Sequence, residues 1–156
     1  MSSDEYTALR AVLRGTLGSA DAKLFNLVTA VTGLLTAVAY ADRKIEPSEA
    51  ELLKDSLTRI NGISRENAET IFSVVQASAV RISTSFLPRF TRLLVENADE
   101  ATRIEVLGVL VEMAAADGTI SFEERNLLRN ITSAMGLTQN RYNQLQTKYR
   151  HLLKFD

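Results

Sequence analysis

Two stretches of the chain resemble each other and decide the fold: ADRKIEPSEAELL at residues 41–53 and ADGTISFEERNLL at residues 116–128. In each stretch an Asp is followed by an Ile three residues later and by a Glu seven residues later. Each follows an apolar segment with helical periodicity and leads into another such segment. The spacing therefore predicts two helix-loop-helix hairpins of the same design.

The match extends beyond the hairpins. Gly62-Ile63-Ser64 corresponds to Gly136-Leu137-Thr138, with one residue fewer in the second copy. The repeated unit is thus predicted to hold three helices, about residues 27–76 and 102–150, and two such units favour a compact bundle with an internal pseudo-two-fold axis.

Helix signals fill most of the remaining chain. The segment 82–86 could pass for a short strand, but Ser85 followed by Phe86, Phe90 and Leu93 suits a helix with Pro88 in its first turn. We therefore predict an all-α fold, a bundle of seven to eight helices in a single domain over residues 1–156. Predicted helix caps are Ser2, Ser64, Asp99, Ser121 and Thr138. Predicted core residues are Leu27, Val31, Leu34, Leu35, Leu52, Leu53, Leu107, Leu110, Val111, Leu127 and Leu128.

Composition excludes several classes of protein. The chain has 156 residues, 46% of them hydrophobic, which is typical of a globular domain and not of a disordered one. Its 18 basic and 19 acidic residues argue against nucleic-acid binding. The absence of Cys excludes disulfides and thiolate metal sites. The polar N-terminus, MSSDEYTALR, is not a signal peptide, and we expect a cytoplasmic protein.

One segment is long and apolar enough to raise the question of a membrane span. Residues 24–41 contain no charge. However, polar or small residues recur along one helical face, at Asn26, Thr29, Gly33, Thr36 and Tyr40. This pattern favours a central core helix over one that faces lipid, so we expect no stable membrane insertion.

Catalysis is not predicted. Carboxylate di-metal enzymes place Glu-x-x-His pairs on facing helices, and the sequence has none. Its one histidine, His151, lies five positions before residue 156, so Ser-His-Asp chemistry would rest on a single histidine near the end of the chain. We therefore expect a protein that is not an enzyme.

The repeated acids have two interpretations from residue chemistry alone. Glu49 and Glu124 fall near the third position of their helices, and Ser121 with Glu124 forms a capping box. Asp42 and Asp117 each follow a long helix, whose negative end disfavours an anion unless loop N–H groups or a bound cation compensate it. A true EF-hand is excluded, because two of its ligand positions would be Met113 and Ala115.

The runs AVAYADRKIEPSEAELL and MAAADGTISFEERNLL resemble the signature of the TerB-like tellurite-resistance domain, which also precedes the J domain in DjlA-type co-chaperones. The resemblance covers roughly residues 24–150. It implies a helical bundle with a two-fold repeat and a metal site of acidic residues in the turns. Matched position by position, these metal-site residues are Asp42, Glu49, Asp117 and Glu124. Glu46 and Glu123 would be outer helpers.

We accordingly expect a non-catalytic, stress-associated binding or scaffold module that holds a divalent cation (calcium, magnesium or manganese) and works with a protein partner or as a homo-oligomer. The alternative is a metal-free structural or regulatory interaction domain, including one that forms a homodimer. The first copy of the repeated motif departs from the family pattern in a way that favours the metal-free alternative. Arg43 replaces the Gly of the pattern and Lys44 follows it, so these bases could neutralise Asp42, Glu46 or Glu49 without a metal.

Overall fold

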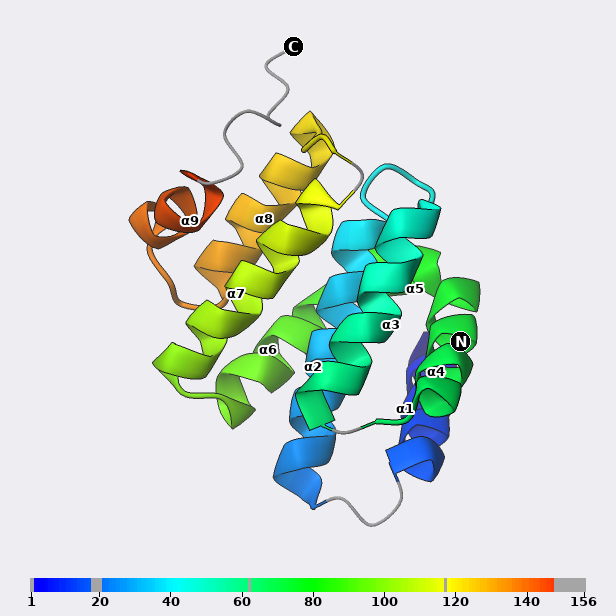
Figure 1. The fold of residues 1–156 in the computed structure, drawn as a ribbon. Coiled ribbons are helices and arrows are strands. Elements are labelled where there is room, and N and C mark those ends of the chain that lie inside the picture. Colours follow the sequence, from blue (N-terminus) through cyan, green and yellow to red (C-terminus); the bar gives the residue numbers. More distant parts are fainter. Residues whose placement is uncertain (1, 18–20, 62, 117, 148–156) are drawn as a thin grey trace.

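The long apolar helix predicted from the sequence is the centre of the molecule. The computed structural model describes residues 2–17, 21–61, 63–116 and 118–147, with the backbone alone for residues 2–5, 17, 60 and 61. Within them, helix α2 (Ala22–Ala39) packs against α1 and against each of α3 to α8 (Figure 1). It is the one described helix long and apolar enough to span a membrane, and 72% of its 18 residues are buried inside the bundle. The prediction of a core helix is confirmed.

The described residues form nine helices and no strand. The other eight are α1 (Ser2–Leu17), α3 (Pro47–Asn61), α4 (Arg65–Ala77), α5 (Ala79–Ser83), α6 (Leu87–Asn97), α7 (Glu100–Ala115), α8 (Phe122–Ala134) and α9 (Gln139–Gln146). The helices α2, α3 and α4 fall in the first predicted repeat, and α7, α8 and α9 fall in the second. The all-α prediction is confirmed, and the helix beyond the predicted seven or eight is the five-residue α5.

Local signals set the helix ends. The side chains of Ser64, Asp99, Ser121 and Thr138 each accept a hydrogen bond from the backbone N–H three residues later. The predicted cap at Ser2 lies outside the described side chains. Near residue 85 the chain forms a turn, and α6 begins at Leu87 with Pro88 in its first turn. Most helix boundaries can therefore be predicted from residues that lie within one helical turn of the boundary.

The core joins both halves of the chain. Of the predicted core residues, Leu27, Leu52 and Leu127 are partly buried at its edge, and the others are buried. The core also includes Phe86 and Phe90, which enter from the segment between the repeats. That segment is thus part of the folded domain.

The closest packing involves α2 and α6, where Gly33 faces the ring of Phe90. A Cβ atom at position 33 would overlap that ring, which is fully buried. Gly33→Ala is therefore expected to destabilise the protein by about 1–3 kcal/mol, although alanine alone favours a helix by about 1 kcal/mol. The midpoint of urea unfolding measures the loss.

Gly15→Ala provides the matched control. Nothing lies within 4 Å of a Cβ atom at this exposed position in α1, so the substitution is expected to stabilise the protein by up to about 1 kcal/mol. Equal midpoints for Gly33→Ala and Gly15→Ala would contradict the close approach of α6 to α2.

Candidate functional site

The two acidic turns meet at one end of the bundle. The first joins α2 to α3 and the second joins α7 to α8, and both lie at the upper end in Figure 1. The hydroxyl of Ser121 donates a hydrogen bond to Oδ1 of Asp42 at 2.9 Å, across 79 positions of sequence. The turns predicted as separate repeats are therefore joined through their side chains.

The two repeated glutamates occupy equivalent positions. Glu49 and Glu124 are 2% and 1% exposed, and each accepts a hydrogen bond of 2.8 Å through Oε1 from the backbone N–H three residues earlier. Ser121 completes the reciprocal capping box with Glu124. The structural interpretation of these glutamates is thus confirmed for one oxygen of each carboxyl group.

The second oxygen of Glu124 has no such role. Oε2 is buried and has no hydrogen-bond partner. The pKa of Glu124 is raised to about 8, chiefly by burial and also by the nearby Asp42 and Glu49 carboxylates, while hydrogen bonds from Ser121 act to lower it. The site therefore holds converging negative charge, which a proton on Glu124 or a bound cation would compensate.

In the first turn one basic residue forms an ion pair, and the other adopts a left-handed backbone conformation. Lys44 pairs with Glu46 at 3.0 Å, and this partner raises the pKa of Lys44. No ion pair is formed by Arg43 in the described structure. Its φ of 72° lies in the left-handed region, as does the φ of 94° at Gly118 in the second turn. The Gly of the repeated pattern is thus explained by backbone conformation, and Arg43 adopts the same turn.

The predicted metal ligands are brought together in part. Asp42, Glu49 and Glu124 are close enough for the first two to act on the pKa of the third. Asp117 lies outside the described residues. Among the described side chains, no three from Asp, Glu, His and Cys form a group ready to hold a metal ion. Of the outer helpers, Glu46 is paired with Lys44, and Glu123 is exposed.

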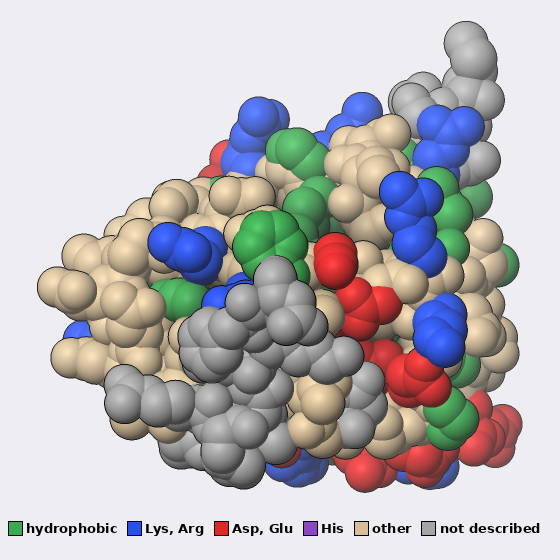
Figure 2. Space-filling model, turned by 90° about the horizontal axis from the view of Figure 1, so that it is seen from above, with side chains coloured by type: hydrophobic (Ala, Val, Ile, Leu, Met, Phe, Trp, Pro, Cys, Tyr) green, Lys and Arg blue, Asp and Glu red, His purple; other side chains and the backbone are tan. Residues whose placement is uncertain are grey.

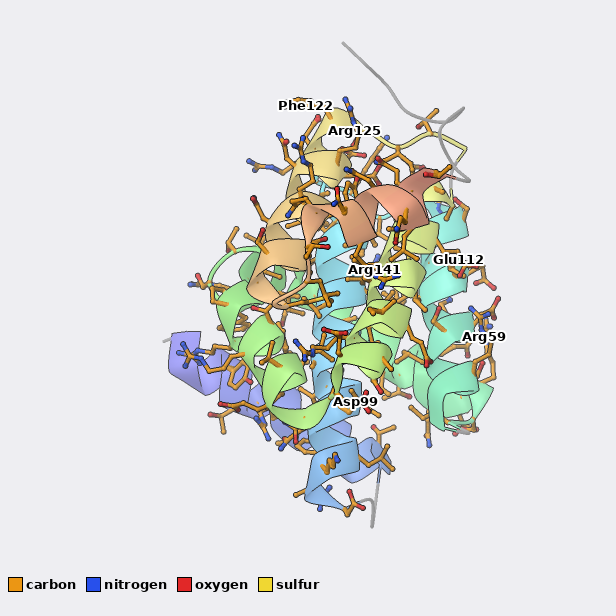
Figure 3. All side chains as sticks on the ribbon, turned by 90° about the vertical axis from the view of Figure 1, so that its left-hand side faces the viewer. Arg59, Asp99, Glu112, Phe122, Arg125 and Arg141 are labelled. Carbon is orange, nitrogen blue, oxygen red and sulfur yellow. The ribbon has the colours of Figure 1, made fainter. Side chains whose placement is uncertain are left out.

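Two features of the site were not predicted. Ser121 links the turns, and the sequence indicated only its capping role. Phe122, beside it, is 54% exposed, and the Arg125 guanidinium lies 5.7 Å from its ring centroid at the upper end of α8 (Figure 3). Acidic side chains gather on this end of the molecule with basic ones around them (Figure 2). His151 lies outside the described residues.

A shallow hollow adjoins the turns. It has a volume of about 250 Å³ and lies between the end of α2, α5 and the start of α8. Tyr40, Arg43, Val80 and Glu123 are among its lining residues. The acidic turns are therefore flanked by a mixed apolar and charged surface.

Comparison with known families gives one match. The family model described as tellurite resistance protein TerB matches residues 28–147, which is most of the chain and includes both acidic turns. No curated protein and no solved structure matches the chain.

Proposed function

The chain belongs to the TerB tellurite-resistance family, and on that premise we propose that it is a stress-associated binding module whose two acidic turns share one divalent-cation site. The observation that carries the proposal is the buried Oε2 atom of Glu124, which lacks a hydrogen-bond partner and belongs to a carboxyl group under the influence of two further carboxylates, those of Asp42 and Glu49. An orphaned buried carboxylate oxygen is costly unless a proton or a cation compensates it.

The donor chemistry of the site fits a hard cation. Calcium, magnesium and manganese prefer carboxylate oxygens, which Asp42, Glu49 and Glu124 offer from both turns. These three side chains do not form a ready-made ligand group, so a cation would have to draw them together on binding. A bound cation would provide the positive charge that holds these three carboxylates together. Asp117 stays a prediction from the sequence as a further ligand.

The raised pKa of Glu124 links cation binding to pH. Near pH 7 the Glu124 carboxyl group holds its proton, since its pKa is about 8. A cation that binds Oε2 must displace this proton, because metal ligands bind in their deprotonated form. Cation affinity is therefore expected to rise as the pH rises toward 8, and binding at neutral pH should release protons.

A second candidate function is a metal-free interaction domain. The observation that favours it is the pair of capping hydrogen bonds from Glu46 N–H and Ser121 N–H, which give Glu49 and Glu124 a structural role without any ion. In that case Glu124 remains protonated, and divalent cations have no effect on stability.

Thermal unfolding in calcium, magnesium or manganese separates the two functions. A ligand that binds only the native state stabilises it by about 2.7 kcal/mol at a hundredfold excess over its Kd. We expect a rise in melting temperature for the wild-type protein and none for the double variant Asp42→Asn with Glu124→Gln. The double variant Asp117→Asn with Glu124→Gln tests Asp117, the further ligand predicted from the sequence, in the same way.

The control removes two acids elsewhere. Glu51 and Asp55 are exposed residues of α3 that pair with Arg65, so Glu51→Gln with Asp55→Asn should keep the cation-dependent rise. Calorimetry in buffers of different ionisation enthalpy measures the expected proton release. Absence of heat with all three ions at millimolar concentration would refute the cation site and leave the metal-free function.

A further inference from the structure

Three arginines, two in α1 and one in α6, lie over aromatic rings. The guanidinium of Arg89 lies 4.9 Å from the ring centroid of Tyr6. Arg10 lies 5.8 Å from the Tyr6 ring and 5.1 Å from that of Phe25, and Arg14 lies 4.9 Å from the Phe25 ring. We call Arg89, Arg10 and Arg14 the arginine ladder.

The rings under the ladder are held by the core. Tyr6 contacts Phe86 edge to face at 5.4 Å between centroids, and both Phe86 and Phe25 are buried. Arg10 is positioned further by a hydrogen bond of 2.9 Å from Nη2 to Oδ1 of Asn26. The guanidinium groups are therefore ordered before any ligand binds, which lowers the entropic cost of binding.

Among the described side chains, the ladder has no acidic partner. Arg10, Arg14 and Arg89 form no ion pair with the described residues. By contrast, Arg65 contacts both Glu51 and Asp55 at 2.7 Å. Apart from the Arg10 N–H that is donated to Asn26, the N–H groups of the ladder are thus available to anions from outside. A planar guanidinium binds a carboxylate through two parallel hydrogen bonds.

The spacing along α1 indicates the shape of the ligand. Tyr6, Arg10 and Arg14 are four residues apart and lie on one helical face, with a rise of about 6 Å between successive positions. A second helix with a Glu at every fourth position presents carboxylates at the same interval. We propose that the arginine ladder binds the acidic face of a helix in a partner protein, independently of the cation site.

Other anionic partners fit the surface less well. A single-stranded nucleic acid stacks its bases on exposed aromatic rings, whereas Phe25 and Phe86 are buried under the ladder. A membrane surface calls for apolar side chains that insert beside the bases. The apolar Leu9 and Leu13 of α1 face the core, and the large apolar side chain exposed on its described part is Val12, at 37%.

Fluorescence anisotropy with a labelled alanine-based peptide that carries Glu at every fourth position tests the proposal. The wild-type protein should bind the peptide at low salt, and the triple variant R10Q/R14Q/R89Q should raise the Kd about tenfold, as expected for three lost surface ion pairs. The matched control R59Q/R129Q/R141Q removes the same charge from α3, α8 and α9, where Figure 3 shows Arg59 and Arg141. The Kd of this control variant should stay within about twofold of the wild-type value, since its three charges are distant from the ladder and screened by salt.

A charge-conserving variant guards against loss of the fold. R10K/R14K/R89K keeps every positive charge but loses the planar pairing of guanidinium with carboxylate, so its Kd should also rise several-fold. A peptide with the same Glu content scattered around its helix should bind more weakly. The proposal is overturned by no binding of the regular peptide, or by equal losses in the ladder and control variants. It is also overturned if phosphatidylserine vesicles or a single-stranded oligonucleotide bind through the ladder while the peptide does not.

Discussion

Glu124→Gln is expected to be more stable than the wild-type protein at pH 8 and about equal to it near pH 4.5. Burial raises the pKa of Glu124 in the folded protein to about 8, from 4.5 in the absence of that environment. Between these values the native state holds a proton that the unfolded chain has lost, so wild-type stability falls as the pH rises. We expect a difference of about 2–4 kcal/mol at pH 8, after allowing for water at the rim of the site.

The amide of glutamine accounts for the difference. It keeps the oxygen that accepts the hydrogen bond from the Ser121 N–H, and it stays uncharged in the buried site at every pH. Because the amide does not ionise, the variant loses the pH dependence that originates at this position. Urea unfolding in the presence of a chelator, at several pH values from 4.5 to 8, measures both curves.

Glu123→Gln is the matched control, since it removes a carboxylate from the neighbouring, exposed position. The free energy of unfolding of Glu123→Gln should change with pH in the same way as that of the wild-type protein. Parallel curves for wild type and Glu124→Gln would show that the Glu124 carboxyl group is not the source of the pH dependence. A divalent cation bound at the site should flatten the wild-type curve, which connects this measurement to the proposed function.

Leu34→Ala or Leu110→Ala is expected to cost about 2–5 kcal/mol, because both side chains are fully buried and the space they leave cannot close completely. Leu34 lies in the central helix α2 and Leu110 in α7, so the two variants test the core of both repeats. Urea unfolding at constant m-value measures the loss.

Val80→Ala serves as the control for these truncations. Val80 is a large apolar residue of α5 with its side chain mostly in solvent, so the change should stay within about 0.5 kcal/mol. A loss well under about 1 kcal/mol for Leu34→Ala would mean that the central core helix is misplaced.

Much of the fold follows from local sequence. Capping by Ser64, Asp99, Ser121 and Thr138 involves atoms three residues apart, and the apolar stripe of α2 depends only on helical periodicity. Interactions of such short range depend little on the rest of the chain, so residue patterns predict them. The repeat of Asp, Ile and Glu likewise predicts two equivalent hairpins from the sequence alone.

The segment between the repeats shows the limit of local signals. Residues 82–86 are compatible with a strand or a helix, and the structure contains the short helix α5 followed by a turn. Ile82 and Phe86 are both fully buried, so packing against the core selects the conformation. A five-residue helix is too short to be stable from its own propensity.

By itself, the sequence determined the all-helical fold, the central α2 helix, the capping roles and the identity of the repeated acids, because each depends on residues close together in the chain. Tertiary structure alone decided that Ser121 of one turn contacts Asp42 of the other, and that Oε2 of Glu124 is buried without a partner near two more carboxylates. It also placed Arg89 beside Arg10 and Arg14 over shared rings. The physical reason is that hydrogen bonding between the turns, desolvation and ring stacking all depend on distances in space, which the spacing of residues along the chain does not define.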